Sequence, residues 1–235
     1  MEFNINKCVC LHVGSKNIQA VYKIGSTLLE IVEKERDLGV TIDNSGKVGE
    51  QCAAMARRAN NVLRQIKRKI RCKSKNVILS LYKSLVRPHL DYCVQVWGPY
   101  LKKDTNLIEA VQRRALRLID NFKYLSYDKR LQKVQMTSLE KRRVRGDLIQ
   151  VFKLFTGIDK LDYKKFFSIN CNRTLRGHQY KIFKDRSRTE LRRNCFSQRI
   201  VNVWNELPIE VVSAETLDIF KKRVDEWFVN SENNN

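Results

Sequence analysis

The segment RRANNVLRQIKRKIRCK, residues Arg57 to Lys73, decides what the middle of this chain must form. It holds eight Lys and Arg residues and no acidic residue, yet its apolar residues keep a regular spacing. Steps of three and four residues return to one side of an α-helix. Six residues follow these steps through the segment and the stretch before it: Cys52, Ala56, Ala59, Leu63, Ile66 and Ile70. The pattern predicts a helix over residues 47–71 that packs on a neighbour along this apolar stripe.

The same helix carries a second stripe, which is basic. Arg57, Arg64, Arg68 and Arg71 return to nearly the same angle around the axis, well apart from the apolar stripe. Charged helix faces usually contact only solvent. This chain, however, is basic as a whole, with 46 Lys and Arg against 25 Asp and Glu and a formal charge of +21. Because so large an excess needs counterions or a polyanionic partner, nucleic acid is the partner class that we expect.

Three further basic clusters follow along the chain, around residues 113–117, 141–145 and 173–193. Each cluster alone is compatible with a solvated face or a transport signal. Four clusters in one chain instead favour an extended surface that contacts phosphates. The predicted nucleic-acid-binding residues are Arg57, Arg64, Arg68, Arg71, Arg113, Arg114, Arg117, Arg142, Arg143, Arg186 and Arg188.

The rest of the chain divides by the period of its apolar residues. Up to about residue 43, apolar residues alternate with other residues in short runs that are separated by glycines. This pattern predicts a small β region. After Gly46 the period changes to that of a helix. Beyond the helix at 47–71, helices are predicted at 75–87, 105–119, 127–134, 138–156, 189–206 and 216–228, and a short strand at 180–183. The predicted fold class is α+β, predominantly α-helical, with the small N-terminal β region followed by a helical bundle.

Local signals set the expected bounds of these helices. The predicted start signals are N-caps at Ser74, Asp104 and Ser126, and a capping box of Thr137 with Glu140. Pro88 is predicted to end the helix at 75–87, and Gly157 the helix at 138–156.

Composition narrows the class of protein. A chain of 235 residues with 43% hydrophobic residues can bury a core of its own. It has no apolar run of about 18 residues and no charged segment followed by an apolar one at its start, so we expect an intracellular soluble protein without a membrane partner. Nuclear and cytoplasmic location are not distinguished. Seven cysteines, an odd number scattered among apolar residues, favour reduced thiols over a disulfide framework.

No set of residues in the sequence has the spacing of a catalytic or metal site. Cys8, Cys10 and His12 alternate along a predicted strand, but a fourth ligand and the usual Cys-x-x-Cys spacing are missing, so no metal is predicted. The chain has no Asp-Asp pair to hold the two metal ions of phosphoryl transfer.

The aromatic residues fall into two classes by their neighbours. Five lie at apolar-periodic positions and are predicted core residues: Trp97, Trp204, Phe220, Trp227 and Phe228. Three lie among basic or polar neighbours and are weaker candidates for stacking on bases: Tyr22, Tyr180 and Phe183.

Several segments occur in an order that resembles a known family. They are Asn4–Cys8 (NINKC), Glu33–Ile42 (EKERDLGVTI), Leu81–Tyr92 (LYKSLVRPHLDY), Leu107–Ile119 (LIEAVQRRALRLI), Arg186–Arg188 (RSR) and Phe196–Pro208 (FSQRIVNVWNELP). Together they resemble the C-terminal part of the reverse transcriptase of LINE-type, non-LTR retrotransposons of the jockey-like kind. The resemblance covers nearly the whole chain.

This resemblance implies a right-hand polymerase of which the chain holds the late part. Lys7 would lie near the phosphates of the incoming nucleotide as an acid or electrostatic stabiliser. The helices after Gly46 would form the thumb, which follows the template–primer duplex. The family's primer grip would correspond to Arg36, Asp37, Leu38, Gly39 and Val40. The metal-binding aspartates of the family would lie upstream of Met1, so the chain alone is predicted to be inactive, with no cofactor of its own and Mg²⁺ only in the intact parent polymerase.

The resemblance also implies a division of the chain. Residues 1–46 would be a palm remnant with the primer-grip hairpin, 47–165 a helical thumb-like bundle, and 166–235 a basic C-terminal extension with helices. The expected partners are RNA and RNA/DNA duplex, with the missing palm and fingers portion or another protein as a further class. Two alternatives stay open: a host-retained protein–protein interaction module, and a degenerate transposon remnant without activity.

Overall fold

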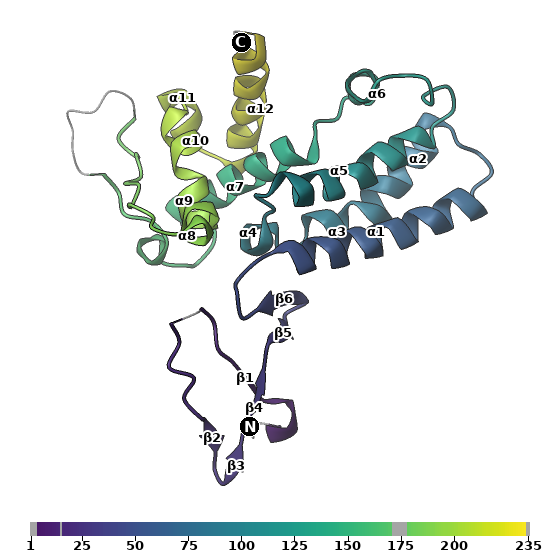
Figure 1. Ribbon diagram of the computed structural model, residues 1–235. Helices are drawn as coiled ribbons and strands as arrows, with labels where there is room; N and C mark the ends of the chain where they lie inside the picture. Colours follow the sequence, from purple (N-terminus) through teal and green to yellow (C-terminus); the bar gives the residue numbers. More distant parts are fainter. Residues whose placement is uncertain (1–3, 15, 171–177, 234–235) are drawn as a thin grey trace. The chain divides into compact units, whose positions relative to one another are not determined.

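The computed structural model describes residues 4–14, 16–170 and 178–233 (Figure 1). The chain divides into two compact units, Met1–Gln135 and Met136–Asn235. Short strands lie at its start and helices make up most of the rest, so the predicted α+β, predominantly helical class is confirmed. The proposed functional division at residues 46 and 165 stays a prediction.

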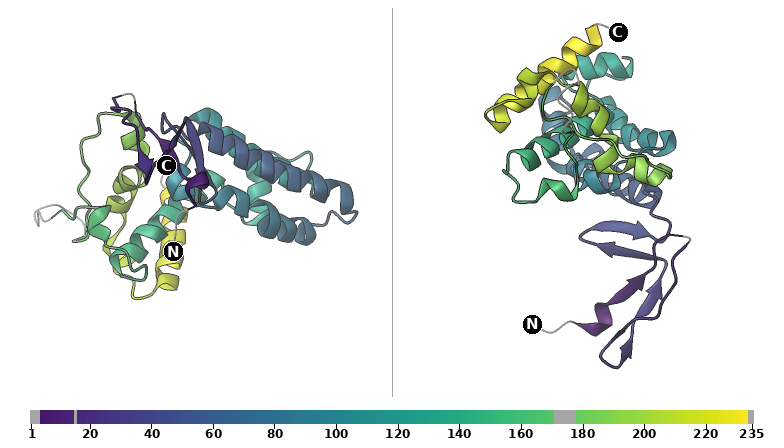
Figure 2. Two further views of the ribbon diagram at one scale, coloured as in Figure 1. Left: turned by 90° about the horizontal axis from the view of Figure 1, so that it is seen from below. Right: turned by 90° about the vertical axis from the view of Figure 1, so that its left-hand side faces the viewer.

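The predicted small β region consists of three strand pairs, seen from two further directions in Figure 2. A single 3₁₀ turn, η1 (Ile5–Lys7), precedes them. The pairs are listed here in chain order: β1 (Val9–Leu11) runs parallel to β4 (Glu30–Val32), β2 (Lys23–Ile24) antiparallel to β3 (Thr27–Leu28), and β5 (Lys34–Asp37) antiparallel to β6 (Val40–Asp43). Each sheet has two strands, so the region has little interior of its own.

The β5–β6 hairpin has a tight turn that is held from outside. Asp37 pairs with Val40, and the two residues between them, Leu38 and Gly39, have φ angles of 45° and 83°. Two positive φ angles are typical of the two-residue turn that matches strand twist, and glycine adopts them without steric cost. The hydroxyl of Tyr92 donates to the carbonyl oxygen of Leu38 at 2.9 Å. This bond ties the hairpin tip to the helical part of the same unit.

Helices fill the rest of the first unit. They are α1 (Gly49–Lys69), α2 (Lys75–Leu81), the π-helical turn η2 (Tyr82–Val86), α3 (Pro88–Asp91), α4 (Val94–Trp97), α5 (Lys102–Arg117) and α6 (Tyr127–Val134). The long helices α1 and α5 pack against each other (Figure 1). The predicted helix at 75–87 is an α-helix up to Leu81 and a π-helical turn from Tyr82 to Val86. Pro88, which was predicted to end this helix, is the first residue of α3. Proline suits a first helical position because its missing N–H has no partner to lose there.

The apolar stripe of α1 is buried as predicted, except at Ile70, which is half-buried just beyond the end of the helix. Cys52, Ala56 and Ala59 are 0–2% exposed, and Leu63 and Ile66 are each 6% exposed. On α5, Ile108, Val111, Ala115 and Leu116 are fully buried. Small side chains at the centre of the α1 stripe suit a close approach of two helices.

A polar cluster is buried among the helices of the first unit. The hydroxyl of Tyr82 donates to Gln112 at 2.7 Å, and the amide nitrogen of Gln112 donates to the Tyr127 hydroxyl at 2.9 Å. Tyr127 in turn donates to Glu109. Burial raises the pKa of both tyrosines above the ordinary value, so they stay neutral donors. These bonds connect η2, α5 and α6.

The second unit is a helical cluster around aromatic residues. Its helices are α7 (Leu139–Phe155), η3 (Tyr163–Lys165), α8 (Glu190–Asn194), α9 (Phe196–Arg199), α10 (Val201–Glu206), α11 (Ile209–Val212) and α12 (Leu217–Asn233). The rings of Phe152 on α7 and Phe220 on α12 stack with centroids 4.2 Å apart. Trp204 is 1% exposed in the same core, and Trp227 and Phe228 pack against it.

Some predicted element bounds are wrong. The predicted helix at 189–206 is three short helices: Cys195 has extended backbone (φ −67°, ψ 154°) between α8 and α9, and Ile200 separates α9 from α10. The predicted strand at 180–183 is a single bridge between Ile169 and Ile182. Helix α1 ends at Lys69, so Arg71 lies beyond the helix that was expected to carry it.

The predicted caps were partly correct. The Ser126 side chain accepts from the N–H of Lys129, as predicted for α6. Helix α7 starts one residue later than predicted, with Ser138 accepting from Lys141. Helix α5 starts at Lys102, which places Asp104 inside its first turn, 5% exposed. Ser74 stands at the N-cap of α2 but makes no side-chain capping bond. Among the described residues no helix is long and apolar enough to cross a membrane.

Candidate nucleic-acid interface

Helix α1 presents one basic face. Arg57, Arg64 and Arg68 are exposed on it, while Leu63 and Ile66 on the other side are buried. A rigid helix holds such residues in a row because steps of four and seven residues bring side chains back to one face. Arg71 is also exposed, in the segment after the helix.

A groove of about 740 Å³ lies where α1 and α5 run side by side. Its walls come from the second half of α1, the end of α5 and the turns that follow each helix. Six basic residues and one acidic residue line it: Arg64, Lys67, Lys73, Arg114, Arg117, Lys123 and Asp120. Tertiary packing thus brings together the basic cluster of α1 and the basic cluster at 113–117, which are separate in sequence.

Two hydrogen bonds hold the groove together. Arg114 on α5 donates through Nη1 to Oδ1 of Asn60 on α1 at 3.0 Å. The backbone N–H of Asp120 donates to the carbonyl oxygen of Lys73 at 3.1 Å and joins the segments that follow the two helices. The relative position of the arginines is therefore set by the packed helices.

A second hollow of about 410 Å³ shares Arg114 and Arg117 with the groove. Arg113, Arg114 and Arg117 line it together with Tyr127 and Arg130. The guanidinium carbon of Arg113 lies 4.9 Å from the ring centroid of Tyr127, a cation–π distance. Arg114 and Arg117 line both hollows, so α5 places positive charge in two adjoining concave surfaces.

Arg130 has a structural role in this second hollow. Its side chain is 5% exposed and donates to the carbonyl oxygens of Phe122 and Lys123 at 2.9 and 3.1 Å. Burial, with Arg117 as a second cause, lowers the pKa of Arg130. Arg130 therefore fixes the turn between α5 and α6, and Arg113, Arg114 and Arg117 present the exposed charge.

The arginines of this surface lack acidic partners. Within the part of the chain that the structure describes, no carboxylate lies at ion-pair distance from the exposed arginines of α1 or α5. The ion pairs shown for the first unit, Lys34–Glu50 and Arg87–Asp91, involve other side chains. The positive charge of the groove is thus available to an external anion.

The predicted arginines of the second unit lie in different surroundings. Arg186 and Arg188 are exposed in the segment before α8. Arg142 is half-buried and Arg143 is only 8% exposed. A guanidinium buried inside its unit does not reach an external phosphate, so Arg143 is not part of the interface that we describe. Arg173 and Arg176 of this basic region lie outside the described residues.

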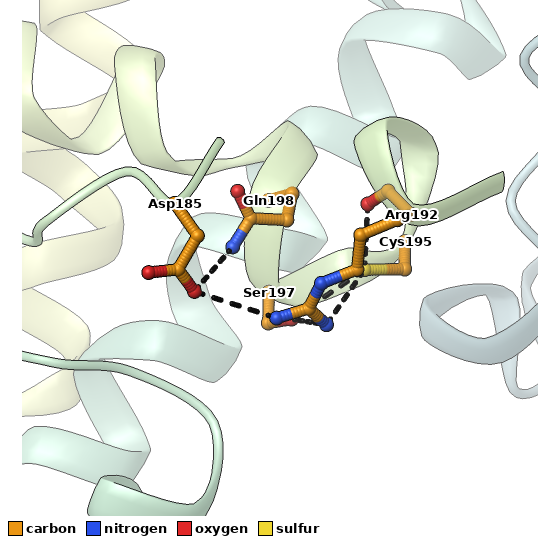
Figure 3. A network of polar contacts seen from close by, with 5 residues as sticks. All are labelled: Asp185, Arg192, Cys195, Ser197 and Gln198. Carbon is orange, nitrogen blue, oxygen red and sulfur yellow. Dashed lines mark hydrogen bonds and ion pairs between the residues drawn. The ribbon is translucent and has the colours of Figure 1, made fainter. Parts of the chain in front are cut away.

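A polar network orders the segment around α8 and α9 (Figure 3). Arg192 points toward Asp185, with Nη2 and Oδ2 3.5 Å apart, and donates to the Ser197 hydroxyl at 3.3 Å. The Cys195 thiol donates to the carbonyl oxygen of Arg192 at 3.0 Å, and Gln198 donates to Asp185 at 3.4 Å. Arg192 is therefore engaged within its own unit.

The residues assigned by family resemblance lie in the first unit. Arg36 and Asp37 are exposed on β5, Leu38 and Gly39 form the turn, and Val40 on β6 is 6% exposed. Lys7 is exposed at the end of η1. Residues 36–40 form a hairpin, as expected, and the contact of these residues with a primer, or of Lys7 with a nucleotide, stays a prediction.

The sulfur and imidazole groups near the N-terminus form no larger cluster. Cys10 Sγ lies 3.5 Å from His12 Nε2, and Cys8 donates to the carbonyl oxygen of Asn4 at 3.4 Å. In the described ranges no three His, Cys, Asp or Glu side chains are placed to hold a metal ion.

Several groove residues were not among the predicted binding residues, including Asn60, Lys67, Lys73, Lys123 and Tyr124. Asn60 carries no charge and gave no signal, although it accepts the bond from Arg114. Tyr124 lies in the turn between α5 and α6, and its side chain at the groove is 89% exposed. Its basic neighbour Lys123 was the only local signal available, and the same signal had pointed to Tyr22, Tyr180 and Phe183, which are exposed but lie outside the groove.

Comparison with curated proteins finds one relevant similarity. The chain is 28% identical over 123 residues to a Drosophila melanogaster protein described as "Probable RNA-directed DNA polymerase from transposon BS". The match covers 51% of this chain and 14% of the relative's length. No protein-family model and no solved structure matches the chain. The similarity supports a relationship between this chain and reverse transcriptases.

Proposed function

We propose that this chain is a non-catalytic part of a retrotransposon RNA-directed DNA polymerase, of the LINE type and jockey-like, that binds RNA or RNA/DNA template–primer through the phosphate backbone. The observation that carries the proposal is the convergence of the α1 and α5 arginines on one groove without acidic partners among the described residues. The similarity to a transposon polymerase supports the same conclusion from sequence. In this proposal α1 to α6 act as the thumb and the β5–β6 hairpin as the primer grip.

The chemistry of the surface suits phosphates rather than specific bases. Arg64, Arg114 and Arg117 offer planar guanidinium groups that bind phosphate oxygens through two hydrogen bonds, and Lys67 and Lys73 add point charges. Contacts to the backbone position a nucleic acid and carry no sequence information directly. A sequence-tolerant affinity that depends on salt is the expected property.

The described residues do not fit a catalytic metal site. Phosphoryl transfer to a primer requires carboxylates that hold two Mg²⁺ ions, and no cluster of such ligands occurs in the described part of the chain. We therefore assign no catalytic step to this chain. Its role in the proposal is to hold the nucleic acid for a catalytic centre formed by other parts of the parent polymerase.

Binding to a labelled RNA/DNA hybrid, followed by fluorescence anisotropy across a salt titration, tests the function. If about six phosphates are neutralised, the plot of log affinity against log salt should have a slope of roughly −4 to −5. Hybrids of unrelated sequence should bind with similar affinity. A flat titration, or binding to one sequence alone, contradicts phosphate-based binding.

A protein–protein interaction module is the second candidate function. The β region exposes large apolar side chains: Val13, Ile18, Val21, Leu28 and Ile31 are each more than half exposed, and Ile18 is 94% exposed. Several exposed large apolar side chains within one short stretch of chain offer a surface that another protein could cover. The partner would be the palm and fingers portion or another protein. Self-association or a stable protein complex in light scattering, combined with weak binding to nucleic acid, would favour this function over the first.

A further inference from the structure

Neither burial nor hydrogen bonding among the described residues explains the position of the Tyr124 side chain. Its side chain is 89% exposed in the turn after α5, and among the described residues its hydroxyl has no hydrogen-bond partner. The ammonium group of Lys123 lies 5.8 Å from the ring centroid. Since the ring buries almost nothing, it adds little to the stability of the unit. It nevertheless lines the α1–α5 groove.

The groove combines two kinds of surface. Leu63, Leu118 and Ile119 line it with apolar side chains, two of them nearly buried, while Arg64, Arg117 and Lys123 supply positive charge. The ring of Tyr124 adds a flat aromatic face. A ligand that covers all of this surface must carry negative charge and also present flat, apolar faces.

A duplex does not satisfy both requirements. Its bases are stacked inside, and it shows mainly phosphates and sugars to a protein. If a duplex bound in the groove, its phosphates would contact the arginines, but no part of it would cover the apolar lining or the ring of Tyr124. A single strand exposes phosphates and base faces together, and aromatic side chains stack on such bases with little regard to sequence.

We propose that the α1–α5 groove binds an unpaired segment of nucleic acid, with its phosphates on the arginines and a base stacked on Tyr124. This inference rests on the proposed function and narrows its ligand from template–primer in general to a single-stranded stretch next to the duplex. In that arrangement Arg57 and Arg68, which do not line the groove, remain for the duplex phosphates. An acidic peptide would match the charge of the groove but has no flat bases for Tyr124.

The test uses the full chain and three labelled probes in fluorescence anisotropy. The probes are a short single strand, the same strand with abasic spacers in place of its bases, and a blunt RNA/DNA hybrid. The variants are Tyr124→Ser, which removes the ring, and Tyr124→Phe, which retains it. Phe166→Ser is the control, because Phe166 is an exposed aromatic residue outside both hollows and outside every set of candidate binding residues. Circular dichroism verifies that each variant keeps its helical content.

We expect Tyr124→Ser to weaken binding of the single strand by roughly tenfold, and Tyr124→Phe and Phe166→Ser to leave it unchanged. The wild type should lose a similar factor on the abasic strand, and Tyr124→Ser should no longer distinguish the two strands. Binding of the blunt hybrid should stay the same in all variants.

Three results would overturn the inference, and they separate it from the proposed function. If the wild type binds the hybrid with the expected salt slope while Tyr124→Ser binds the single strand normally, the inference fails and the function stands. An equal loss on single strand and hybrid also refutes the stacking role. If the wild type binds none of the three probes, both the inference and the proposed function fail.

Discussion

The buried imidazole of His178 donates a hydrogen bond to the backbone carbonyl of Trp204. His178 Nε2 lies 3.1 Å from the carbonyl oxygen of Trp204, and the backbone N–H of Tyr180 donates to His178 Nδ1 at 3.2 Å. Nδ1 is thus an acceptor and Nε2 the donor, which describes a neutral ring. The side chain is 4% exposed, and burial lowers the pKa of His178 below its ordinary value of 6.5.

This arrangement predicts a loss of stability in mild acid. Because the pKa of His178 is lower in the folded than in the unfolded chain, its contribution is fully present above pH 6.5 and is lost as the pH falls toward the folded-state pKa. We expect urea unfolding at several pH values to show this decline. His178→Gln should make the decline shallower, whereas His89→Gln in the first unit should not. A decline of equal steepness in wild type and His178→Gln contradicts the prediction.

The basic row of α1 should contribute to affinity without affecting stability. Changing Arg57, Arg64, Arg68 and Arg71 together to Gln keeps helix propensity nearly the same. We expect weaker binding for all sequences and a shallower salt slope, by about 0.7–0.9 for each residue that contacts a phosphate. Lys102→Gln with Lys103→Gln, at exposed positions outside both hollows, is the control. If the quadruple variant is folded and its affinity and slope are unchanged, α1 is only a solvated face.

The apolar stripe of α1, by contrast, should determine the stability of the fold. Ile66 is 6% exposed, so Ile66→Ala removes buried methylene groups and should lower the free energy of unfolding by about 2–5 kcal/mol. The exposed neighbour Gln65 provides the control, because Gln65→Ala should change the free energy of unfolding by less than about 0.5 kcal/mol. Urea denaturation measures both. Similar values for the two variants would show that α1 does not pack along this stripe.

Two ion pairs of the second unit should differ in importance because they differ in burial. Arg199 donates to both carboxylate oxygens of Asp147, at 2.8 and 3.1 Å, and the Asp147 side chain is 4% exposed. Burial raises the pKa of Asp147, against the opposing effect of Arg199. Asp147→Ala leaves Arg199 uncompensated and should cost about 3–5 kcal/mol of stability. Asp225, which pairs with Arg145 at the surface, should cost less than about 1 kcal/mol when changed to Ala.

The purified chain should not extend a primer. With no carboxylate cluster among the described residues to hold two metal ions, we expect no nucleotide incorporation on a primed RNA template with Mg²⁺ or Mn²⁺. The control is a polymerase of known activity in the same buffer. Incorporation that persists after removal of contaminating polymerases would mean that a catalytic site has been overlooked.

Most helices of this chain, and many of the residues that face inward, follow from local patterns in the sequence. The apolar stripe of α1, the buried Trp97, Trp204 and Phe220, and the Ser126 cap were all predicted, because a period of 3.6 residues and the capping of backbone N–H groups are local properties. Local patterns also explain the errors. Nothing near Cys195 indicated an extended residue inside an apparently continuous helix.

Packing between distant segments sets which charges lie close together. Arg64 and Arg114 are far apart in sequence and line one groove because α1 packs on α5. Arg143, in a cluster that looked equivalent, is buried in its own unit. Tyr124 became a candidate contact only when the turn after α5 was placed beside α1. The spacing of residues along one helix fixes the direction of each side chain, but the surface it faces depends on packing between segments that are distant in the chain.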